Sequence, residues 1–200
     1  ARDADPRDPA VMRLLTTAFW NAGNLPAAAR AVRDWARLES ARPLVHRTAS
    51  RIYEDMGALS LAVEAADRAV QRAPGDGSAW ARLGRLRLRT GDRSGALAAL
   101  ERARLIEPTV EALLDLALAQ HLAGDLGAEV SACEQATLVD PDSPAAWSRY
   151  AHALARTDRV SDTLAAAERA LALAEDPEVR DLLERVRDAQ PRGLQRPAAA

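Results

Sequence analysis

Glycine and proline recur at one shared spacing along this chain of 200 residues. Four glycines, at positions 23, 57, 91 and 124, are separated by successive intervals of 34, 34 and 33. Three prolines, Pro74, Pro108 and Pro141, repeat the last two intervals. Trp80 and Trp147 are separated by the sum of those two intervals, 34 + 33. Because three residue types share one period, including its single-residue deletion, the sequence predicts an array of stacked repeats.

The residues between these markers favour helices. Hydrophobic residues make up 48% of the chain but aromatic residues only 4%, and Ala, Leu and Arg dominate. These are strong helix formers, and no stretch alternates apolar and polar residues as a half-buried strand would. The predicted fold class is therefore all-α. No window approaches the roughly 18 apolar residues of a membrane-spanning helix, so we expect no membrane insertion.

The charged residues are unusual in one respect, because all 27 basic residues are Arg and none is Lys. We interpret this bias as the codon usage of a GC-rich, bacterial genome. The net charge of −2 favours neither nucleic acid nor an anionic membrane as a partner. The chain begins at Ala1 without Met, which suggests a processed form or a piece of a longer protein, so the sequence leaves a cytoplasmic or periplasmic location open.

Residues 77–108 carry the most complete copy of the repeat. Trp80 stands at the fourth position, Leu83 and Gly84 at the seventh and eighth, and Pro108 at the thirty-second. This pattern resembles the tetratricopeptide repeat. The resemblance extends over five ranges, which are 9–40, 43–74, 77–108, 110–141 and 144–175. It implies a right-handed α-solenoid, or superhelix, in which each repeat is a pair of antiparallel helices, A and B.

Local signals agree with this arrangement. Proline stands at four expected helix starts, where its missing N–H costs no hydrogen bond: Pro9, Pro43, Pro144 and Pro177. The eighth position, where helices A and B should cross closely, always holds a small residue: Thr16, Ser50, Gly84, Ala117 and Ala151. Four residues depart from the family's usual pattern: Trp35, Arg87, Glu129 and Asp158.

Residues 177–190 predict one further helix. Its apolar residues follow i, i+3, i+4, i+7 spacing, at Val179, Leu182, Leu183 and Val186. Such a helix, charged on its other face, can cap the apolar surface of the last repeat. We expect residues 1–8 to form an N-terminal extension and residues 191–200 to form a disordered tail.

The sequence contains no recognisable catalytic or metal-binding pattern. It lacks a glycine-rich phosphate loop, a His-Glu-x-x-His helix and paired cysteines for zinc. Cys133 falls at an inward-facing position, so we expect a buried and inert thiol. His121 and His152 fall on neighbouring A helices and are expected to be solvated, because a metal site would need more ligands. We therefore predict that the protein is not an enzyme and needs no cofactor or metal.

The A helices carry the signal for a binding surface. In tetratricopeptide proteins, positions two, five, six, nine, twelve and thirteen of the A helices usually line a concave groove. By this resemblance the candidate groove residues are Arg13, Arg47, Arg51, Arg82, Arg85, Arg89, Leu118, His121, Arg149, His152 and Arg156. The five A helices contain nine Arg and four acidic residues, a net charge of +5 in a chain of −2. A concave wall of one sign attracts the opposite charge, and guanidinium groups bind carboxylates through paired hydrogen bonds.

These features predict a non-catalytic interaction scaffold, or adaptor, that binds a protein or peptide segment of acidic character in the concave groove. The simpler alternative is that the Arg residues only solvate an exposed face of a Lys-free protein. A second functional alternative is a structural or self-associating arm of a larger assembly, and hence a homo-oligomer. RNA binding, known for similar paired-helix repeats, is disfavoured by the Trp-Leu-Gly-Ala-Pro pattern and by the acidic residues of the B helices, so we expect no nucleic-acid partner.

Overall fold

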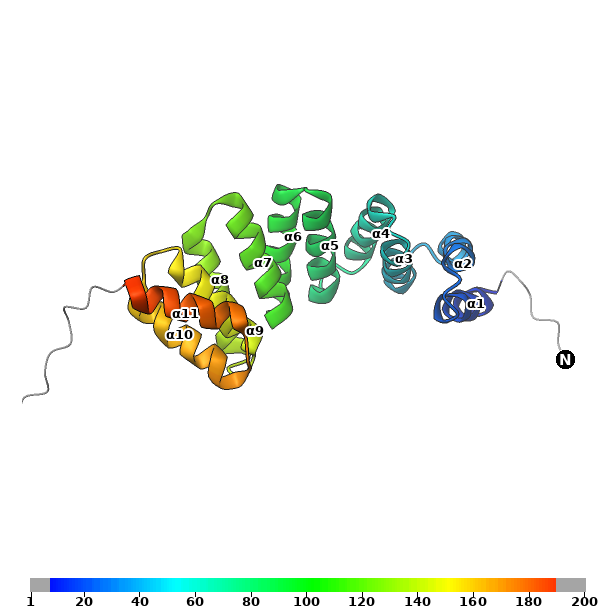
Figure 1. Ribbon diagram of the computed structural model, residues 1–200. Coiled ribbons are helices and arrows are strands. Elements are labelled where there is room, and N and C mark those ends of the chain that lie inside the picture. The colour runs from blue at the N-terminus through cyan, green and yellow to red at the C-terminus, as the bar shows by residue number, and fades with distance from the viewer. Residues whose placement is uncertain (1–7, 190–200) are drawn as a thin grey trace, which may run out of the picture. The chain divides into compact units, whose positions relative to one another are not determined.

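The computed structural model describes residues 8–189, and every regular element in that range is an α-helix (Figure 1). The helices are α1 (Pro9–Asn21), α2 (Leu25–Leu38), α3 (Pro43–Asp55), α4 (Leu59–Arg72), α5 (Gly77–Thr90), α6 (Arg93–Ile106), α7 (Val110–Ala123), α8 (Leu126–Val139), α9 (Pro144–Ala155), α10 (Val160–Leu173) and α11 (Pro177–Ala189). The predicted tail at 191–200, and all but the last residue of the predicted extension at 1–8, lie outside the described residues.

Consecutive helices pack as pairs, and each pair within a unit packs on the next. The pairs are α1 with α2, α3 with α4, α5 with α6, α7 with α8, and α9 with α10. Helix α11 packs on α9 and α10. The chain divides into two compact units, Ala1–Pro108 with α1 to α6 and Thr109–Ala200 with α7 to α11. The prediction of an all-α solenoid built from helix pairs is confirmed.

The helix ends follow from the residues that occupy them. At the start of α1 the side chain of Asp8 accepts a hydrogen bond from the backbone N–H of Ala10 at 2.8 Å. Helices α5 and α7 end at Gly91 and Gly124, whose φ angles of +82° and +80° suit a residue without Cβ. Between α9 and α10, Asp158 replaces this glycine and adopts a φ of +54°. Aspartate tolerates that region better than most residues because its short polar side chain bonds locally.

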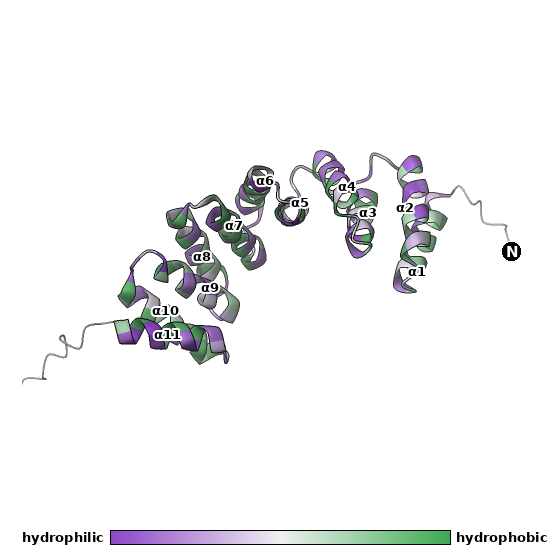
Figure 2. Ribbon diagram, turned by 45° about the horizontal axis from the view of Figure 1, so that its top comes forward, coloured by the Kyte–Doolittle hydropathy of each residue, from purple (hydrophilic) through white to green (hydrophobic). Residues whose placement is uncertain are grey.

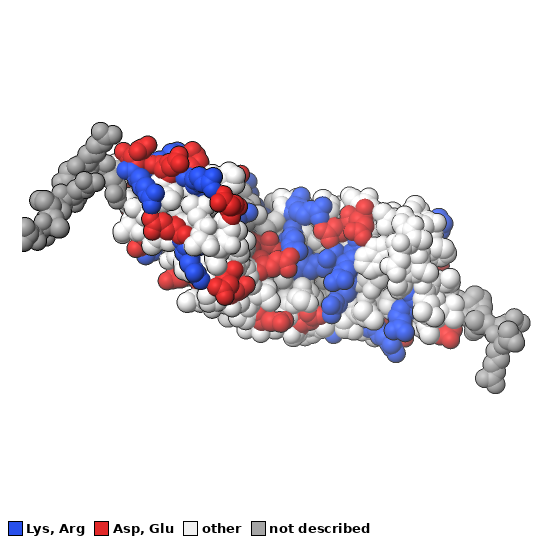
Figure 3. All heavy atoms as spheres, turned by 60° about the horizontal axis from the view of Figure 1, so that its bottom comes forward, with Lys and Arg blue, Asp and Glu red and all other residues white. Residues whose placement is uncertain are grey.

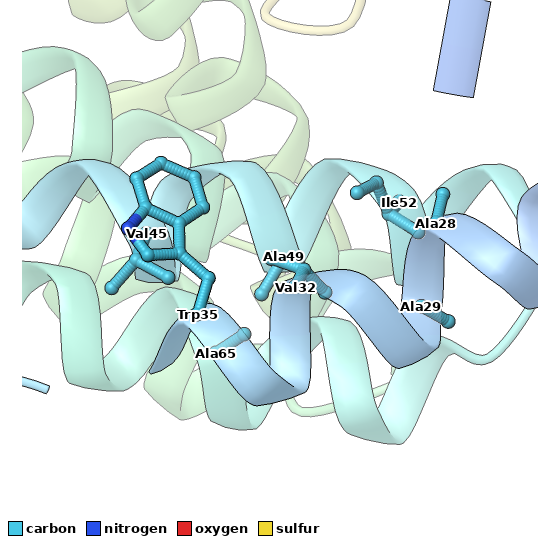
Figure 4. Close-up of a cluster of buried hydrophobic side chains, with 8 residues drawn as sticks. All are labelled: Ala28, Ala29, Val32, Trp35, Val45, Ala49, Ile52 and Ala65. Atoms are coloured by element: carbon cyan, nitrogen blue, oxygen red, sulfur yellow. The ribbon is translucent and has the colours of Figure 1, made fainter. Parts of the chain in front are cut away.

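The core around α2, α3 and α4 is built on Trp35 (Figure 4). The cluster consists of Ala28, Ala29, Val32, Trp35, Val45, Ala49, Ile52 and Ala65. Trp35 is only 2% exposed, and its indole N–H donates to the carboxylate of Glu39 at 2.7 Å. Because four of the eight cluster members are Ala, they leave room for an indole at a position where the family usually has a small residue.

In three of the A helices, a ring N–H donates a hydrogen bond to a backbone carbonyl of the turn that precedes the helix. The indole N–H of Trp80 donates to the carbonyl of Pro74 at 3.0 Å, and that of Trp147 donates to Pro141 at 2.8 Å. His46 occupies the same fourth position, and its Nε2 donates to a carbonyl six residues earlier at 2.8 Å. The large residue at position four therefore sets the angle at which the chain enters each of these helices.

Arg87, the residue of α5 that departs from the pattern, has defined partners. Its guanidinium donates to the carboxylate of Asp67 on α4 at 2.8 Å and to the carbonyl of Gly95 on α6 at 3.1 Å. A polar residue is tolerated at this position because the charge is paired at the edge of the helix contact.

The last helix covers the preceding pair with one face. Val179, Leu182 and Leu183 of α11 are 0%, 5% and 7% exposed. Hydrophobic and hydrophilic residues alternate along its ribbon in Figure 2, as expected for a helix with one buried face. Without this helix, the apolar side of α9 and α10 would face water.

The tightest contact among the pairs predicts the effect of a single methyl group. A Cβ added to Gly84 of α5 would lie 2.4 Å from Cγ of Leu100, which is fully buried on α6. We expect Gly84→Ala to lower the free energy of unfolding by about 1–3 kcal/mol, because the core must move to admit the methyl. Urea denaturation followed by circular dichroism measures this change.

Gly127→Ala on α8 is the matched control. A Cβ there would meet its nearest atom at 3.7 Å, so the change should be neutral or stabilise the helix by up to about 1 kcal/mol. If Gly84→Ala were as stable as Gly127→Ala, the close crossing of α5 and α6 would be wrong.

Candidate functional site

Helices α7, α8, α9 and α11 line a cavity of about 290 Å³ in the second unit. All five groove residues predicted in this part of the chain contribute to its lining, namely Leu118, His121, Arg149, His152 and Arg156. Glu129, Ser148 and Glu178 add further polar groups, and Leu114 adds an apolar one. The structure thus brings together residues from separate helices that the sequence assigned to one surface.

Glu129 is the central charged residue of this cavity. It lies on α8, and its side chain is only 7% exposed. One carboxylate oxygen accepts a hydrogen bond from the guanidinium of Arg156, the residue that follows α9. The other accepts one from Nδ1 of His121 on α7 at 3.1 Å. Since a carboxylate can only accept, His121 carries its proton on Nδ1 and leaves Nε2 available.

Sequence reasoning missed the role of Glu129 and treated it as a mismatch. The repeat pattern expects Ala at this position, on a helix face that packs against its neighbours. The presence of a carboxylate there was the signal that could have identified Glu129 as a site residue. A buried carboxylate needs counter-charges or hydrogen-bond donors, and the two candidates, His121 and Arg156, were both among the predicted groove residues.

The wall formed by α9 is tied to the last helix. Nδ1 of His152 donates to the carbonyl of Ser148 at 2.9 Å, and the hydroxyl of Ser148 donates to the carboxylate of Asp176 at 3.1 Å. Asp176 also caps α11 by accepting from the backbone N–H of Val179 at 3.3 Å. Desolvation acts to raise the pKa of Asp176, but these hydrogen bonds outweigh it and hold the pKa below its usual value.

Arg149 differs from the other cationic residues of the cavity. It is exposed, and it forms no salt bridge with any residue between 8 and 189. Glu178 lines the same cavity and likewise has no side-chain ion pair within that range. With Glu129 and Arg156 already paired, Arg149 is the guanidinium that an incoming carboxylate or amide oxygen can contact without displacing an internal partner.

The six remaining predicted residues lie in the first unit, and three of them are held by acidic side chains. Arg82 and Arg89, both on α5, form salt bridges with the carboxylate of Glu54 on α3. Arg47 pairs with Asp76 at 2.9 Å. On the face shown in Figure 3, basic and acidic side chains are correspondingly interspersed. The surface is therefore less basic than the count of +5 on the A helices suggested.

The first unit nevertheless has arginines whose positive charge no described salt bridge neutralises. Arg13 and Arg51 are exposed and form no salt bridge within the described part of the chain. Burial lowers the pKa of Arg82, the pairing with Glu54 acts against this, and the charges of Arg51 and Arg85 lower it further. The charges of Arg51 and Arg85 act on Arg82 only because the three side chains lie near one another. We therefore treat Arg51, Arg82 and Arg85 as one basic group.

Residues 8–189 offer few other reactive or metal-binding groups. Cys133 is 1% exposed, and its pKa is raised to about 12, first by burial and then by the negative charge of Glu129. Residues 8–189 contain no group of three or more His, Cys, Asp or Glu side chains placed to hold a metal ion. Within the same residues, no helix has the length and apolar character needed to cross a membrane.

The stacked helix pairs define the class of the fold, which is a tetratricopeptide-repeat solenoid. A crystal structure of MamA matches with a TM-score of 0.77 at 17% identity, over 82% of this chain and 91% of that one. YrrB, described as a TPR protein with an unusual peptide-binding site, matches with a TM-score of 0.76 at 16% identity, over 90% and 94%. MamA from Desulfovibrio magneticus RS-1 matches with a TM-score of 0.71 at 23% identity, over 90% and 97%.

No family model and no curated protein sequence matches the chain. In contrast, 314 solved chains share its fold, so the fold is too widespread to select a function.

The ion pair at the base of the cavity predicts an asymmetry between two variants. Arg156→Ala leaves the buried carboxylate of Glu129 with His121 as its remaining partner and should cost about 2 kcal/mol of stability. Glu129→Ala leaves Arg156 and His121 where water can solvate them, so it should stay within about 1 kcal/mol of the original protein. Urea unfolding at pH 7 compares the two, and the double variant should recover most of the loss. Equal losses for the two single variants would contradict this account of the cavity.

The raised pKa of Cys133 predicts its reactivity. At pH 8 the folded protein should react with iodoacetamide at least 100-fold more slowly than the protein in urea, because the thiolate forms readily only after unfolding. Mass spectrometry of the alkylated protein over time measures both rates. Labelling of the folded protein as fast as a free cysteine would show that the thiol is exposed and reactive.

Proposed function

We propose that this protein is a non-catalytic interaction scaffold that binds a peptide segment of a partner protein on its A-helix faces. The observation that carries the proposal is the cavity of the second unit, where residues of α7, α8, α9 and α11 surround the guanidinium of Arg149, which forms no salt bridge with residues 8–189. Its volume, about 290 Å³, lies at the lower end of small-ligand pockets and suits one side chain of a longer segment.

The lining supports a peptide of mixed character. Leu114 and Leu118 offer an apolar wall, and Arg149 and Ser148 offer polar groups beside it. A carboxylate or backbone carbonyl of the partner would accept hydrogen bonds from Arg149, while a neighbouring apolar side chain would contact the leucines. Such a combination of one anchoring side chain and a few directed polar contacts is typical of peptide recognition.

The first unit supports an acidic residue elsewhere in the partner, but not a long acidic run. Arg51, with Arg82 and Arg85 beside it, provides a basic group on the A-helix side of α3 and α5. Glu54 already neutralises part of that group through its two salt bridges. We therefore infer isolated acidic residues among apolar ones rather than a polyacidic segment.

Self-association is the second candidate function, and α1 supports it. Leu14 is 64% exposed and Leu15 is 39% exposed on this helix, which places apolar area on the surface. Light scattering after size exclusion at two protein concentrations distinguishes the two candidates, because only a self-associating protein gains mass with concentration.

The peptide proposal predicts which arginine matters for binding. The probe is a labelled dodecapeptide that alternates Leu and Ala and carries two Glu, and fluorescence polarisation measures its affinity. Arg149→Ala should weaken binding about tenfold, because one charge-assisted hydrogen bond is lost. Replacing both Glu of the peptide with Gln should remove the difference in affinity between Arg149→Ala and the original protein.

Arg169→Ala is the matched control for this experiment. Arg169 is an exposed residue of α10 outside the cavity, paired with Asp142 at 3.1 Å. Its replacement should leave the affinity unchanged. If Arg149→Ala and Arg169→Ala bind the probe equally, the cavity is not the peptide site.

A further inference from the structure

A second cavity, of about 420 Å³, lies in the first unit where the B helices α2 and α4 meet against α3. Four guanidinium groups line it, as two pairs spaced one helical turn apart: Arg33 and Arg37 on α2, and Arg68 and Arg72 on α4. Among the described residues that line it, none is acidic. None of the predicted groove residues contributes to it either, so this cavity is separate from the peptide site proposed above.

The floor of this cavity is apolar and buried. Val32, Ala49 and Ala65 line it and are 0%, 6% and 2% exposed. Tyr53 of α3 lies beside them, half-buried, and its hydroxyl forms no hydrogen bond with any residue of the described range. The cavity therefore combines an apolar floor and a phenol with a rim of positive charge.

Two of the four arginines have acidic neighbours, but only weak ones. Arg37 pairs with Asp34 at 2.8 Å, and Arg68 pairs with Glu64 at 3.4 Å. The side chains in both pairs are more than half exposed, and such pairs contribute little stability because water competes for them. A ligand that binds the guanidinium groups has little internal interaction to displace.

The other two arginines have no acidic partner among residues 8–189. Arg33 donates through Nε to a backbone carbonyl of its own helix at 3.3 Å, which leaves its two terminal nitrogens available. Arg72 forms no salt bridge with the part of the chain that the structure describes. Counting the four arginines against Asp34 and Glu64 gives a local charge of +2.

This concentration of arginine is not a consequence of the repeat. One full repeat further along the chain, the same four positions hold Asp67, Gln71, Arg102 and Ile106. The repeat pattern therefore permits an acid and two uncharged residues at these positions. The four arginines are specific to the junction between α2 and α4.

We propose that this cavity binds a phosphate monoester, with the phosphate between the two arginine pairs and an apolar or aromatic body on the floor beside Tyr53. A phosphate monoester carries about −1.5 to −2 charges at pH 7, which matches the local charge of +2. Guanidinium groups bind phosphate oxygens through paired hydrogen bonds. Either a phosphorylated side chain of a partner or a free organic phosphate supplies this chemistry.

Isothermal titration calorimetry with the full chain tests the proposal. The probes are phenyl phosphate, inorganic phosphate, a phosphotyrosine peptide and the same peptide without phosphate. Phenyl phosphate should bind at least threefold more tightly than inorganic phosphate, because it also covers the apolar floor. A phosphopeptide that binds more tightly than phenyl phosphate identifies a protein partner as the source, and equal affinities identify a small molecule.

Three double variants locate the binding. Arg33→Gln with Arg72→Gln should weaken phenyl phosphate at least tenfold. Arg30→Gln with Arg102→Gln, two exposed arginines of α2 and α6 outside the cavity, should leave its affinity unchanged. Asp34→Asn with Glu64→Gln should strengthen binding at least twofold, a gain that a misfolded protein cannot produce.

Two results would overturn the proposal. One is no binding of phenyl phosphate by the unmodified protein at millimolar concentration. The other is an equal loss of affinity in the Arg33/Arg72 and Arg30/Arg102 variants, which would show non-specific attraction to surface charge.

Discussion

The close crossing of the two helices in each pair is the contact on which the remaining structure depends. In α5 it requires Gly84, because the side chain of Leu100 occupies the space that a Cβ would need. In α1 and α3 the same position holds Thr16 and Ser50, both fully buried. Both hydroxyls have partners, since Thr16 donates to a carbonyl of its own helix at 2.7 Å and Ser50 accepts from Arg82 on α5 at 3.1 Å. The small core residues can bury enough area only because the helices approach this closely.

Polar contacts then link the second and third repeats of the first unit, and the last two repeats and α11 of the second unit. Arg47 with Asp76, Arg82 with Glu54, Ser148 with Asp176, and Arg156 with Glu129 all join residues 27 to 29 positions apart. Repeat proteins derive much of their stability from such interfaces between neighbours. The arginines of the A helices therefore have a structural task in addition to any task in binding. A ligand gains most from the guanidinium groups that this network leaves available.

The two proposed sites use different parts of the repeat for different chemistry. The peptide site lies on A helices, where regular spacing places side chains from successive repeats beside one another. The phosphate site lies between two B helices and depends on four arginines that the repeat does not require. Because each site lies within one compact unit, neither proposal depends on how the two units are arranged.

The sequence by itself determined the fold, since period, turn glycines, helix-starting prolines and small crossing residues are all local requirements of a helix pair. It also identified five of the residues that line the cavity of the second unit, because groove positions recur with the repeat. Only the tertiary structure decided which charges are neutralised. The count of +5 on the A helices omitted Asp76 and Glu129, which lie on other segments and reach these arginines through space. Likewise, Arg33 and Arg72 are far apart along the chain and became one site only when α2 and α4 packed on α3. Electrostatic interactions depend on distance in space, which a repeat pattern read along the chain does not contain.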